Sequence, residues 1–501
     1  MLKKIRTILA LVFFVGITLL FLDFTGTAHR WLAWMAKVQF LPAVLALNAI
    51  VVVALIVLTL IFGRIYCSVI CPLGVMQDFF AWLGKKAKKN RYSYSKALSW
   101  LRYTVLGVFI VALVAGIGSI FQLLAPYSAY GRIATTIFQP LWKLGNNGLA
   151  AIAERIDSYA FYSIDVLVPS MGVVLAIAVI TLLVLFPLAW KNGRTYCNTI
   201  CPVGTILSFF ARFSWLKIHI DVDKCRNCSL CSKNCKAACI DFKNHRIDYS
   251  RCVVCGDCIE KCNSGAIKYA HPQKERHSTP LAYREGQGGE SGGESGRRSF
   301  LLASGLIATA ALAQEKKKVD GGLAEIKDKV APKRQTPLTP PGSFSAKHFA
   351  QHCTGCQLCV SECPNQVLRP STDLMHLMLP TVSYELGYCR PECNRCSEVC
   401  PAGAIKPIAL EDKVSTQIGH AVWIKKNCLV LTDDVECGNC ARHCPTGAIE
   451  MVPSDPDDDE SPYVPAINEE RCIGCGACEN LCPARPFSAI YVEGHEVHRE
   501  V

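Results

Sequence analysis

The chain has 501 residues, of which 51% are hydrophobic and only 19% are charged, so it is neither disordered nor wholly soluble. It contains 29 cysteines in short regular clusters, which favours metal binding over the disulfide scaffold of a short secreted chain. The net charge of +12 is uneven, because residues 1–313 carry +19 and residues 314–501 carry −7. The basic residues stand beside apolar segments, so we expect two compartments and no nucleic-acid binding.

Four apolar segments without charged residues are long enough, or nearly long enough, to span a bilayer. They are residues 8–22, 41–62, 103–125 and 166–190. A cleaved signal peptide is the alternative for the first segment, but no small-residue cleavage site follows it, so we expect an anchor. Lys and Arg crowd residues 64–102 and are sparse in the loop predicted over residues 126–165, which places residues 64–102 in the cytoplasm. We therefore predict an α-helical membrane domain of four helices within residues 1–216.

One motif occurs twice in this domain. Cys67-x3-Cys71-Pro72 recurs as Cys197-x3-Cys201-Pro202, within two twelve-residue segments that are identical at eight positions. Each copy follows the second helix of a pair, so a pseudo-two-fold axis along the membrane normal would bring the copies together. Residues four apart share one helix face. The four thiols form a candidate redox site that could hold a metal or a further cluster, or perform dithiol chemistry; two buried structural pairs are the alternative.

Residues 217–270 contain two runs of the form Cys-x2-Cys-x2-Cys-x3-Cys. This spacing is typical of bacterial ferredoxins, in which the fourth cysteine ligates the neighbouring [4Fe–4S] cluster. The exchange predicts two ligand sets: Cys225, Cys228, Cys231, Cys262; and Cys252, Cys255, Cys258, Cys235. Lys236 and Asn263 replace the proline that usually follows the fourth cysteine. Cys239 is left over, so either Cys235 or Cys239 completes the second set.

Residues 271–296 are rich in Gly, Ser and Glu and are expected to form a flexible linker. Arg297 and Arg298 then begin a segment, residues 297–313, that is similar to a twin-arginine export signal. Such a signal suits a domain that crosses the membrane already folded, because clusters are inserted in the cytoplasm. A fifth membrane helix with ordinary positive flanking is the alternative, and cleavage after residue 313 is left open. Residues 314–345 are predicted to form a second linker.

Residues 346–501 contain four further cysteine runs and are predicted to form a periplasmic domain with four [4Fe–4S] clusters. Two runs depart from regular spacing, Cys389-x3-Cys393 and Cys428-x8-Cys437, yet loops of these lengths can reach one cluster. The four predicted sets are Cys353, Cys356, Cys359, Cys400; Cys389, Cys393, Cys396, Cys363; Cys428, Cys437, Cys440, Cys482; and Cys472, Cys475, Cys478, Cys444. The chain is thus expected to hold six [4Fe–4S] clusters in α+β bacterial-ferredoxin-like domains. Structural zinc and disulfides are the alternatives, although zinc sites use isolated Cys-x2-Cys pairs.

The repeated Cys-x3-Cys-Pro motif, the four predicted helices and the ferredoxin runs after them resemble NapH-type membrane polyferredoxins over residues 1–270. From Arg297 onward, the export signal and four cluster sets resemble NapG/MauM-type periplasmic ferredoxins. The resemblance implies a fusion of two proteins that elsewhere work as a pair.

This resemblance implies a multi-pass protein of the bacterial inner membrane, with a cytoplasmic ferredoxin domain and a periplasmic C-terminal domain. It also implies quinol, from the quinone pool of the lipid, as substrate and a periplasmic reductase or cytochrome as electron acceptor. The chain would then be an electron-transfer subunit of a quinol dehydrogenase rather than a stand-alone catalyst. An assembly or maturation factor, or a redox regulator, for a periplasmic metalloenzyme is the alternative function.

Overall fold

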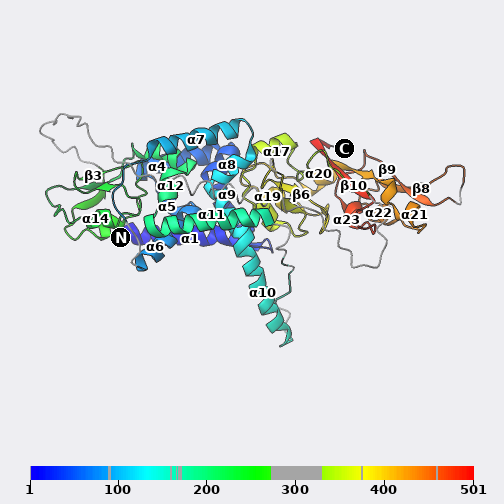
Figure 1. The fold of residues 1–501 in the computed structure, drawn as a ribbon, viewed down its shortest axis with the longest axis horizontal. Coiled ribbons are helices and arrows are strands. Elements are labelled where there is room, and N and C mark those ends of the chain that lie inside the picture. Colours follow the sequence, from blue (N-terminus) through cyan, green and yellow to red (C-terminus); the bar gives the residue numbers. More distant parts are fainter. Residues whose placement is uncertain are drawn as a thin grey trace, which may run out of the picture. The chain divides into compact units, whose positions relative to one another are not determined.

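The structure is a computed structural model that describes residues 2–87, 92–157, 161–164, 166, 172–271, 330–373, 376–458 and 461–500. Its contacts divide the chain into one unit of Met1–Pro272 with Val330–Val501 and a second unit of Gln273–Lys329. The predicted export signal over residues 297–313, nearly all of the first linker and the first part of the second linker lie outside the described residues. The first unit is described below (Figure 1).

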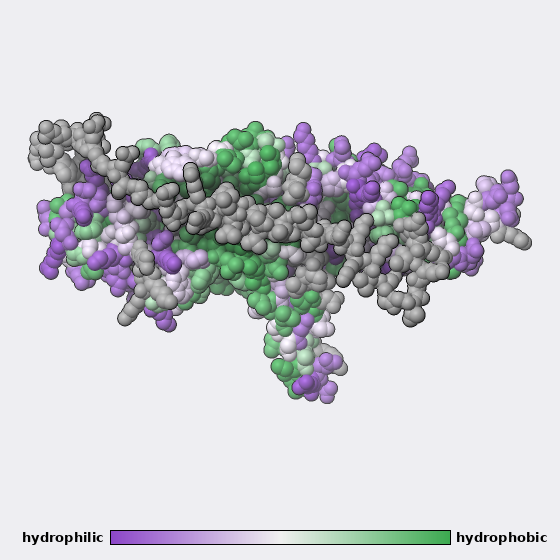
Figure 2. All heavy atoms as spheres, viewed as in Figure 1, coloured by the Kyte–Doolittle hydropathy of each residue, from purple (hydrophilic) through white to green (hydrophobic). Residues whose placement is uncertain are grey.

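Two of the described helices are long and apolar enough to cross a membrane. They are α1 (Leu2–Leu22) and α11 (Gly172–Asn192), each of 21 residues. At 1.5 Å per residue each is about 31 Å long, which matches the hydrocarbon core of a bilayer. Apolar side chains such as Leu11 and Leu183 are 60% and 65% exposed. Hydrophobic residues gather over α7 and around α11 in Figure 2.

The other two predicted spans are interrupted. Residues 41–62 form α3 (Phe40–Leu45) and α4 (Ala49–Phe62), because Leu47 adopts a left-handed φ of 53° and the Asn48 side chain caps α4. Residues 103–125 belong to α7 (Ser99–Val114) and α8 (Gly118–Leu124), with Gly116 at a φ of 72° between them. Among the described residues, two of the four predicted membrane helices are therefore continuous. Each of the other two predicted segments is divided into two helices within its apolar run.

Helices also occupy most of the loop predicted over residues 126–165. They are α9 (Pro126–Ile133), the π-helical segment η1 (Ala134–Phe138) and α10 (Gln139–Glu154). Each copy of the repeated motif forms a short helix followed by a helix that starts at the proline: α5 (Tyr66–Val69) with α6 (Pro72–Lys86), and α12 (Thr195–Thr199) with α13 (Pro202–Ala211). Proline suits the first turn because the missing N–H would have no helical partner there. Helix α6 packs against α11.

Small antiparallel sheets and short helices make up the first cysteine-rich region. Strand β1 (Lys217–Ile220) pairs with β4 (Ile267–Ala270), and β2 (Ile240–Asp241) pairs with β3 (Arg246–Ile247). The single-turn helices α14 (Leu230–Lys233) and α15 (Asp257–Glu260) follow the cysteine loops. This alternation of loop, turn of helix and strand is the α+β ferredoxin pattern that the sequence predicts.

The C-terminal region repeats this pattern. Its paired strands are β5 (Leu368–Pro370) with β6 (Pro380–Val382), β7 (Thr416–Trp423) with β10 (Ile490–Glu500), and β8 (Ile449–Pro453) with β9 (Tyr463–Ile467). Its helices are α17 (Ala346–His352), α18 (Leu358–Glu362), α19 (Arg395–Val399), α20 (Leu410–Ser415), α21 (Leu429–Thr432), α22 (Asn439–Arg442) and α23 (Ala477–Asn480). Residues 330–345, predicted as linker, pack onto this region: Arg334 Nε donates to Val492 O at 2.9 Å, and Leu338 is 1% exposed.

Helix α1 contacts a cysteine-rich region at each of its ends. Near its N-terminus, Lys3 Nζ lies 3.1 Å from Asp257 Oδ1 of α15. Near its C-terminus, Phe21 packs beside Gly131, where an added Cβ would lie 2.2 Å from Cys356 O. About 27 Å of helix separates Lys3 from Phe21, at 1.5 Å per residue.

Candidate iron–sulfur sites and the paired cysteine motif

The first predicted set lines one cavity in the N-terminal ferredoxin region. Its four members are Cys225, Cys228, Cys231 and Cys262. Asn227 and Ser229 adopt left-handed φ values of 50° and 59°, so the backbone turns sharply between the first three cysteines. The fourth cysteine reaches the cavity from the turn before β4. The structure therefore gathers three cysteines of the first run with the fourth of the second run.

The second predicted set is buried and has Cys239 beside it. Burial, together with the neighbouring sulfurs of Cys255, Cys252 and Cys235, raises the pKa of Cys258. Cys239 Sγ lies 3.5 Å from Cys235 Sγ, and this hydrogen bond lowers the pKa of Cys235 to about 7. Hydrogen bonds to Cys235 and Cys252 raise the pKa of Cys239. Either sulfur could donate this hydrogen bond; with Cys235 as the predicted ligand, its thiolate would accept and Cys239 would donate.

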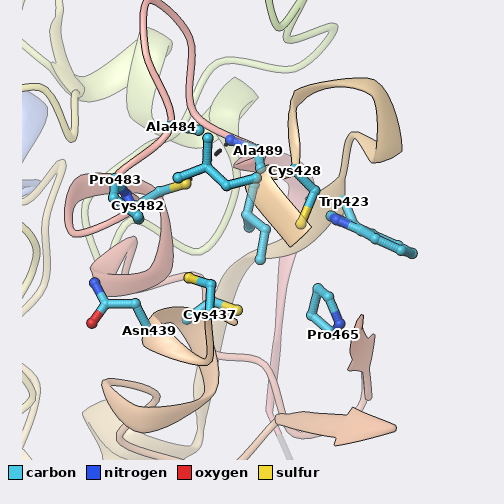
Figure 3. A pocket seen from close by; sticks show the side chains of 12 residues that line it. Trp423, Cys428, Cys437, Asn439, Pro465, Cys482, Pro483, Ala484 and Ala489 are labelled. Atoms are coloured by element: carbon cyan, nitrogen blue, oxygen red, sulfur yellow. Dashed lines mark hydrogen bonds between the residues drawn. The ribbon is translucent and has the colours of Figure 1, made fainter. Parts of the chain in front are cut away.

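Three cavities of the C-terminal region are each lined by one predicted set. The sets are Cys353, Cys356, Cys359, Cys400; Cys363, Cys389, Cys393, Cys396; and Cys428, Cys437, Cys440, Cys482. Figure 3 shows the sulfur atoms of Cys428, Cys437 and Cys482 around the third cavity, with Ala489 N donating to Cys482 Sγ at 3.3 Å. In the remaining set, burial and the nearby sulfurs of Cys475, Cys472 and Cys444 raise the pKa of Cys478.

The spacing of the sulfur atoms fits an iron–sulfur cluster better than a single tetrahedral ion. Within the described part of the chain, the one group with three ligand atoms all within 4.8 Å of one another is Asp23, His29 and Glu362. A zinc ion with Zn–S distances of about 2.3 Å would hold its sulfurs about 3.8 Å apart. All 29 cysteines are free thiols, so no disulfide explains the sets. Four thiols around one cavity fit the larger [4Fe–4S] cluster.

The repeated motif brings its four thiols together. Cys67, Cys71, Cys197 and Cys201 are 4–5% exposed, and the other three are the electrostatic neighbours of Cys201. Two of the sulfurs accept hydrogen bonds at 3.3 Å: Gln77 Nε2 donates to Cys197 Sγ, and Gly204 N donates to Cys201 Sγ. Donors directed at sulfur stabilise a thiolate and tune the potential of a bound cluster.

Each copy of the motif is held by the arginine of the other copy. Arg64 Nη2 donates to Cys197 O at 3.2 Å, and Arg194 Nη1 donates to Cys67 O. Both arginines are fully buried. Glycine is required at the matching close approaches, because a Cβ at Gly74 would lie 2.2 Å from Cys67 O and one at Gly204 would lie 2.5 Å from Cys197 O. The same contacts thus occur in both directions between the two copies, as expected for copies related by a pseudo-two-fold axis.

Hydrogen bonds connect the motif to the N-terminal ferredoxin region. Arg194 N donates to Lys236 O at 2.8 Å, and Asn198 Nδ2 donates to Ala237 O at 3.2 Å. These two carbonyls follow Cys235, a predicted ligand of the second set.

A second line of hydrogen bonds runs toward the C-terminal region. Tyr196 Oη, one residue before Cys197, donates to Leu124 O at 3.1 Å. Arg132 Nη1 donates to Gln122 O at 2.9 Å, and Gln122 Nε2 donates to Cys353 O at 3.3 Å. Gln122 and Arg132, which sequence reasoning did not single out, therefore join the helices to a predicted cluster loop.

The fold and these sites define a polyferredoxin attached to an apolar helical region. Residues 44–91 and 171–222 match a family model described as a 4Fe-4S binding domain, and residues 435–485 match a 4Fe-4S dicluster domain. The chain is 29% identical to the ferredoxin-type protein NapG of Escherichia coli (strain K12) over 202 residues, which cover 38% of this chain and 82% of NapG.

Two further relatives establish the family. The chain is 30% identical to the ferredoxin-type protein NapF of the same strain over 161 residues, covering 32% of this chain and 87% of NapF. It is 30% identical to the methylamine utilization ferredoxin-type protein MauM of Methylobacillus flagellatus over 167 residues, covering 32% of this chain and 70% of MauM. No solved structure matches the chain. The chain belongs to the ferredoxin-type 4Fe–4S proteins, a class whose iron–sulfur clusters carry electrons. The resemblance to NapH-type proteins stays a prediction.

Proposed function

We propose that this protein carries electrons across the bacterial inner membrane, from the quinol pool to a periplasmic reductase or cytochrome. One observation carries the proposal: predicted cluster sites are packed at both ends of α1, and the four motif thiols lie in the helical region between them. A membrane-length helix with redox sites at each end is the architecture that electron transfer across a bilayer requires.

The membrane placement is supported by the apolar helices. We assign α1 and α11 as full spans and the pairs α3–α4 and α7–α8 as bent ones. Exposed side chains such as Leu11, Val114 and Leu183 would be unfavourable in water and suit lipid. The positive-inside rule then favours the cytoplasm for residues 64–102 and for residues 217–270 at the same end of α1. The C-terminal region, which packs at the other end of α1, would lie in the periplasm.

The cysteine sets supply the electron-carrying sites. Each bound [4Fe–4S] cluster takes up and returns one electron. The six predicted sets would hold the clusters through thiols that are buried or half-buried, except that of Cys228, which is exposed. The motif thiols, with donors from Gln77 and Gly204, form a further candidate redox site between the two cytoplasmic and the four periplasmic sets.

Thiol reduction during enzyme maturation, one of the alternative functions, needs accessible thiols. The motif thiols are at most 5% exposed, so a partner protein cannot reach them without local opening. This burial supports electron transfer over dithiol exchange.

Purified protein in nanodiscs tests the proposal. We expect a reduced short-chain quinol analogue to bleach the visible absorbance of the clusters, and an added electron acceptor to restore it. A Cys353→Ser variant, which alters one periplasmic set, should slow the reoxidation and leave the other sets able to be reduced by dithionite. Clusters that dithionite reduces but quinol does not would refute quinol as the donor.

A further inference from the structure

A buried group of one histidine and two carboxylates lies outside all of the cysteine sets. Asp23 follows α1, His29 lies on α2 (Thr27–Lys37), and Glu362 ends α18 of the C-terminal region. Their side chains are 9%, 9% and 2% exposed. One ligand atom from each lies within 4.8 Å of the other two. The group therefore connects the helical region to the C-terminal ferredoxin region through three polar side chains from which water is nearly excluded.

The distances converge on His29 Nδ1. This atom lies 2.6 Å from Glu362 Oε1 and 3.9 Å from Asp23 Oδ2. Neither ring nitrogen of His29 has a hydrogen bond of acceptable geometry with the described residues, and the same is true of Glu362 Oε1. Nδ1 and Glu362 Oε1 are close enough to pair with each other, whereas His29 Nε2 has no partner among the described residues, and buried polar atoms are rarely left unpaired.

Asp23 is fixed in place by the backbone of the turn before α2. Its Oδ1 accepts from Thr25 N at 2.9 Å and from Gly26 N at 3.0 Å, and its Oδ2 accepts from Ala28 N at 2.7 Å. A carboxylate held by several N–H groups stays ionised. Its Oδ2 also accepts a longer hydrogen bond from His29 N at 3.3 Å, and a bound cation would take the place of this second donor. The site is thus preorganised on one side.

The charge of the group also calls for a cation. When His29 is neutral, the two buried carboxylates leave two negative charges in a region of low solvent access, which is unfavourable without a cation. One imidazole nitrogen and two carboxylate oxygens form a donor set that suits Zn²⁺, Mn²⁺ or Fe²⁺, whereas Ca²⁺ and Mg²⁺ prefer oxygen alone.

We propose that Asp23, His29 and Glu362 bind one divalent transition-metal ion, which fastens the C-terminal ferredoxin region to the helical region. The ion would have three protein ligands, from two segments more than 300 residues apart in sequence. The site does not depend on the direction or the donor of electron flow, so it stands separately from the proposed function. The competing structure is a metal-free ion pair in which a protonated His29 balances the carboxylates.

Mn²⁺ binding to the full-length, cluster-loaded protein in detergent distinguishes the two. Electron paramagnetic resonance counts free Mn²⁺ by its six-line signal, which weakens on binding. We expect about one tightly bound Mn²⁺ per chain in the wild type and in His376→Gln, which removes an exposed His–Asp pair elsewhere. We expect at least a tenfold weaker affinity in Glu362→Gln and His29→Gln.

A second measurement covers variants that fold poorly. Mn²⁺ should raise the unfolding temperature of the wild type, because a ligand that binds only the folded state stabilises it. Cluster absorbance reports whether Glu362→Gln leaves the adjacent Cys363 site intact. Absence of stoichiometric Mn²⁺ binding by the wild type, or equal binding by Glu362→Gln, would leave the ion pair alone and overturn the proposal.

Discussion

Replacing Asp78 with asparagine removes a carboxylate that three cations share. Asp78 Oδ1 lies 2.7 Å from Arg194 Nε, and Oδ2 lies 2.9 Å from Arg6 Nη1 and 3.0 Å from Lys236 Nζ. The three cationic side chains are at most 9% exposed. They come from α1, from the second copy of the motif and from the N-terminal ferredoxin region, so Asp78 ties three parts of the chain together.

The expected cost follows from what Asp78→Asn leaves behind. Removing one partner of a buried ion pair costs about 3–5 kcal/mol, because the other charge stays buried without compensation. Lys236 keeps Asp257, 3.3 Å away, so the loss falls mainly on Arg6 and Arg194. We therefore expect Asp78→Asn to lower the free energy of unfolding by about 3–5 kcal/mol. The contact between the two motif copies should also weaken, because Arg194 donates to Cys67 O.

The assay is the urea midpoint at which cluster absorbance is lost from the purified protein in detergent. The matched control is Asp221→Asn, since Asp221 is partly exposed and pairs with exposed Lys224 at 3.3 Å. We expect the control to unfold like the wild type and Asp78→Asn to unfold at much lower urea. Equal midpoints for the two variants would refute the shared-carboxylate reasoning.

Three further predictions concern single side chains. Cys197→Ser should abolish quinol-dependent electron transfer and leave the spectra of the six ferredoxin clusters unchanged; normal turnover would return the motif cysteines to a structural role. Burial, helped by His495, lowers the pKa of His498 to about 4 from an ordinary value of 6.5, so its contribution to stability is complete above pH 6.5 and is lost as the pH falls toward 4. We expect the free energy of unfolding of His498→Gln to lack this pH dependence, which amounts to at most about 3 kcal/mol in the wild type. Identical pH profiles of unfolding for the variant and the wild type would contradict this expectation. Cys239→Ala should lower the reduction potential of the neighbouring cluster by roughly 20–40 mV, as expected for losing a weak hydrogen bond to its sulfurs, and a redox titration with no shift would exclude the donor role.

The cysteine sets were open to prediction because ligand spacing in a ferredoxin run is a local property. Three cysteines separated by two residues must curl around one point, and the fourth ligand comes from the partner run. Four of the predicted sets line four cavities of the structure. The position of Cys239 was not open to prediction, because the sequence leaves open which of Cys235 and Cys239 completes the second set, and the structure shows their sulfurs only 3.5 Å apart.

The interruptions of the helices and the long-range polar groups were harder to foresee. Hydropathy does not report φ, so the breaks at Leu47 and Gly116 lie hidden in continuous apolar runs. A role for Asp78 could have been suspected from the sequence, because it is the single acidic residue among the basic residues 64–102. The proximity of Asp23, His29 and Glu362 could not, because no short-range pattern connects residues so far apart in sequence.

The central claim is that electrons cross the bilayer within this one chain. Sealed liposomes that contain the reconstituted protein, with ferricyanide trapped inside and dithionite added outside, test it directly, because neither reagent crosses the membrane readily. We predict rapid reduction of the trapped ferricyanide with the wild type and only background reduction with Cys197→Ser or with empty liposomes. Background reduction with the wild type, in vesicles whose outward-facing clusters are fully bleached by dithionite, would contradict a path through the membrane.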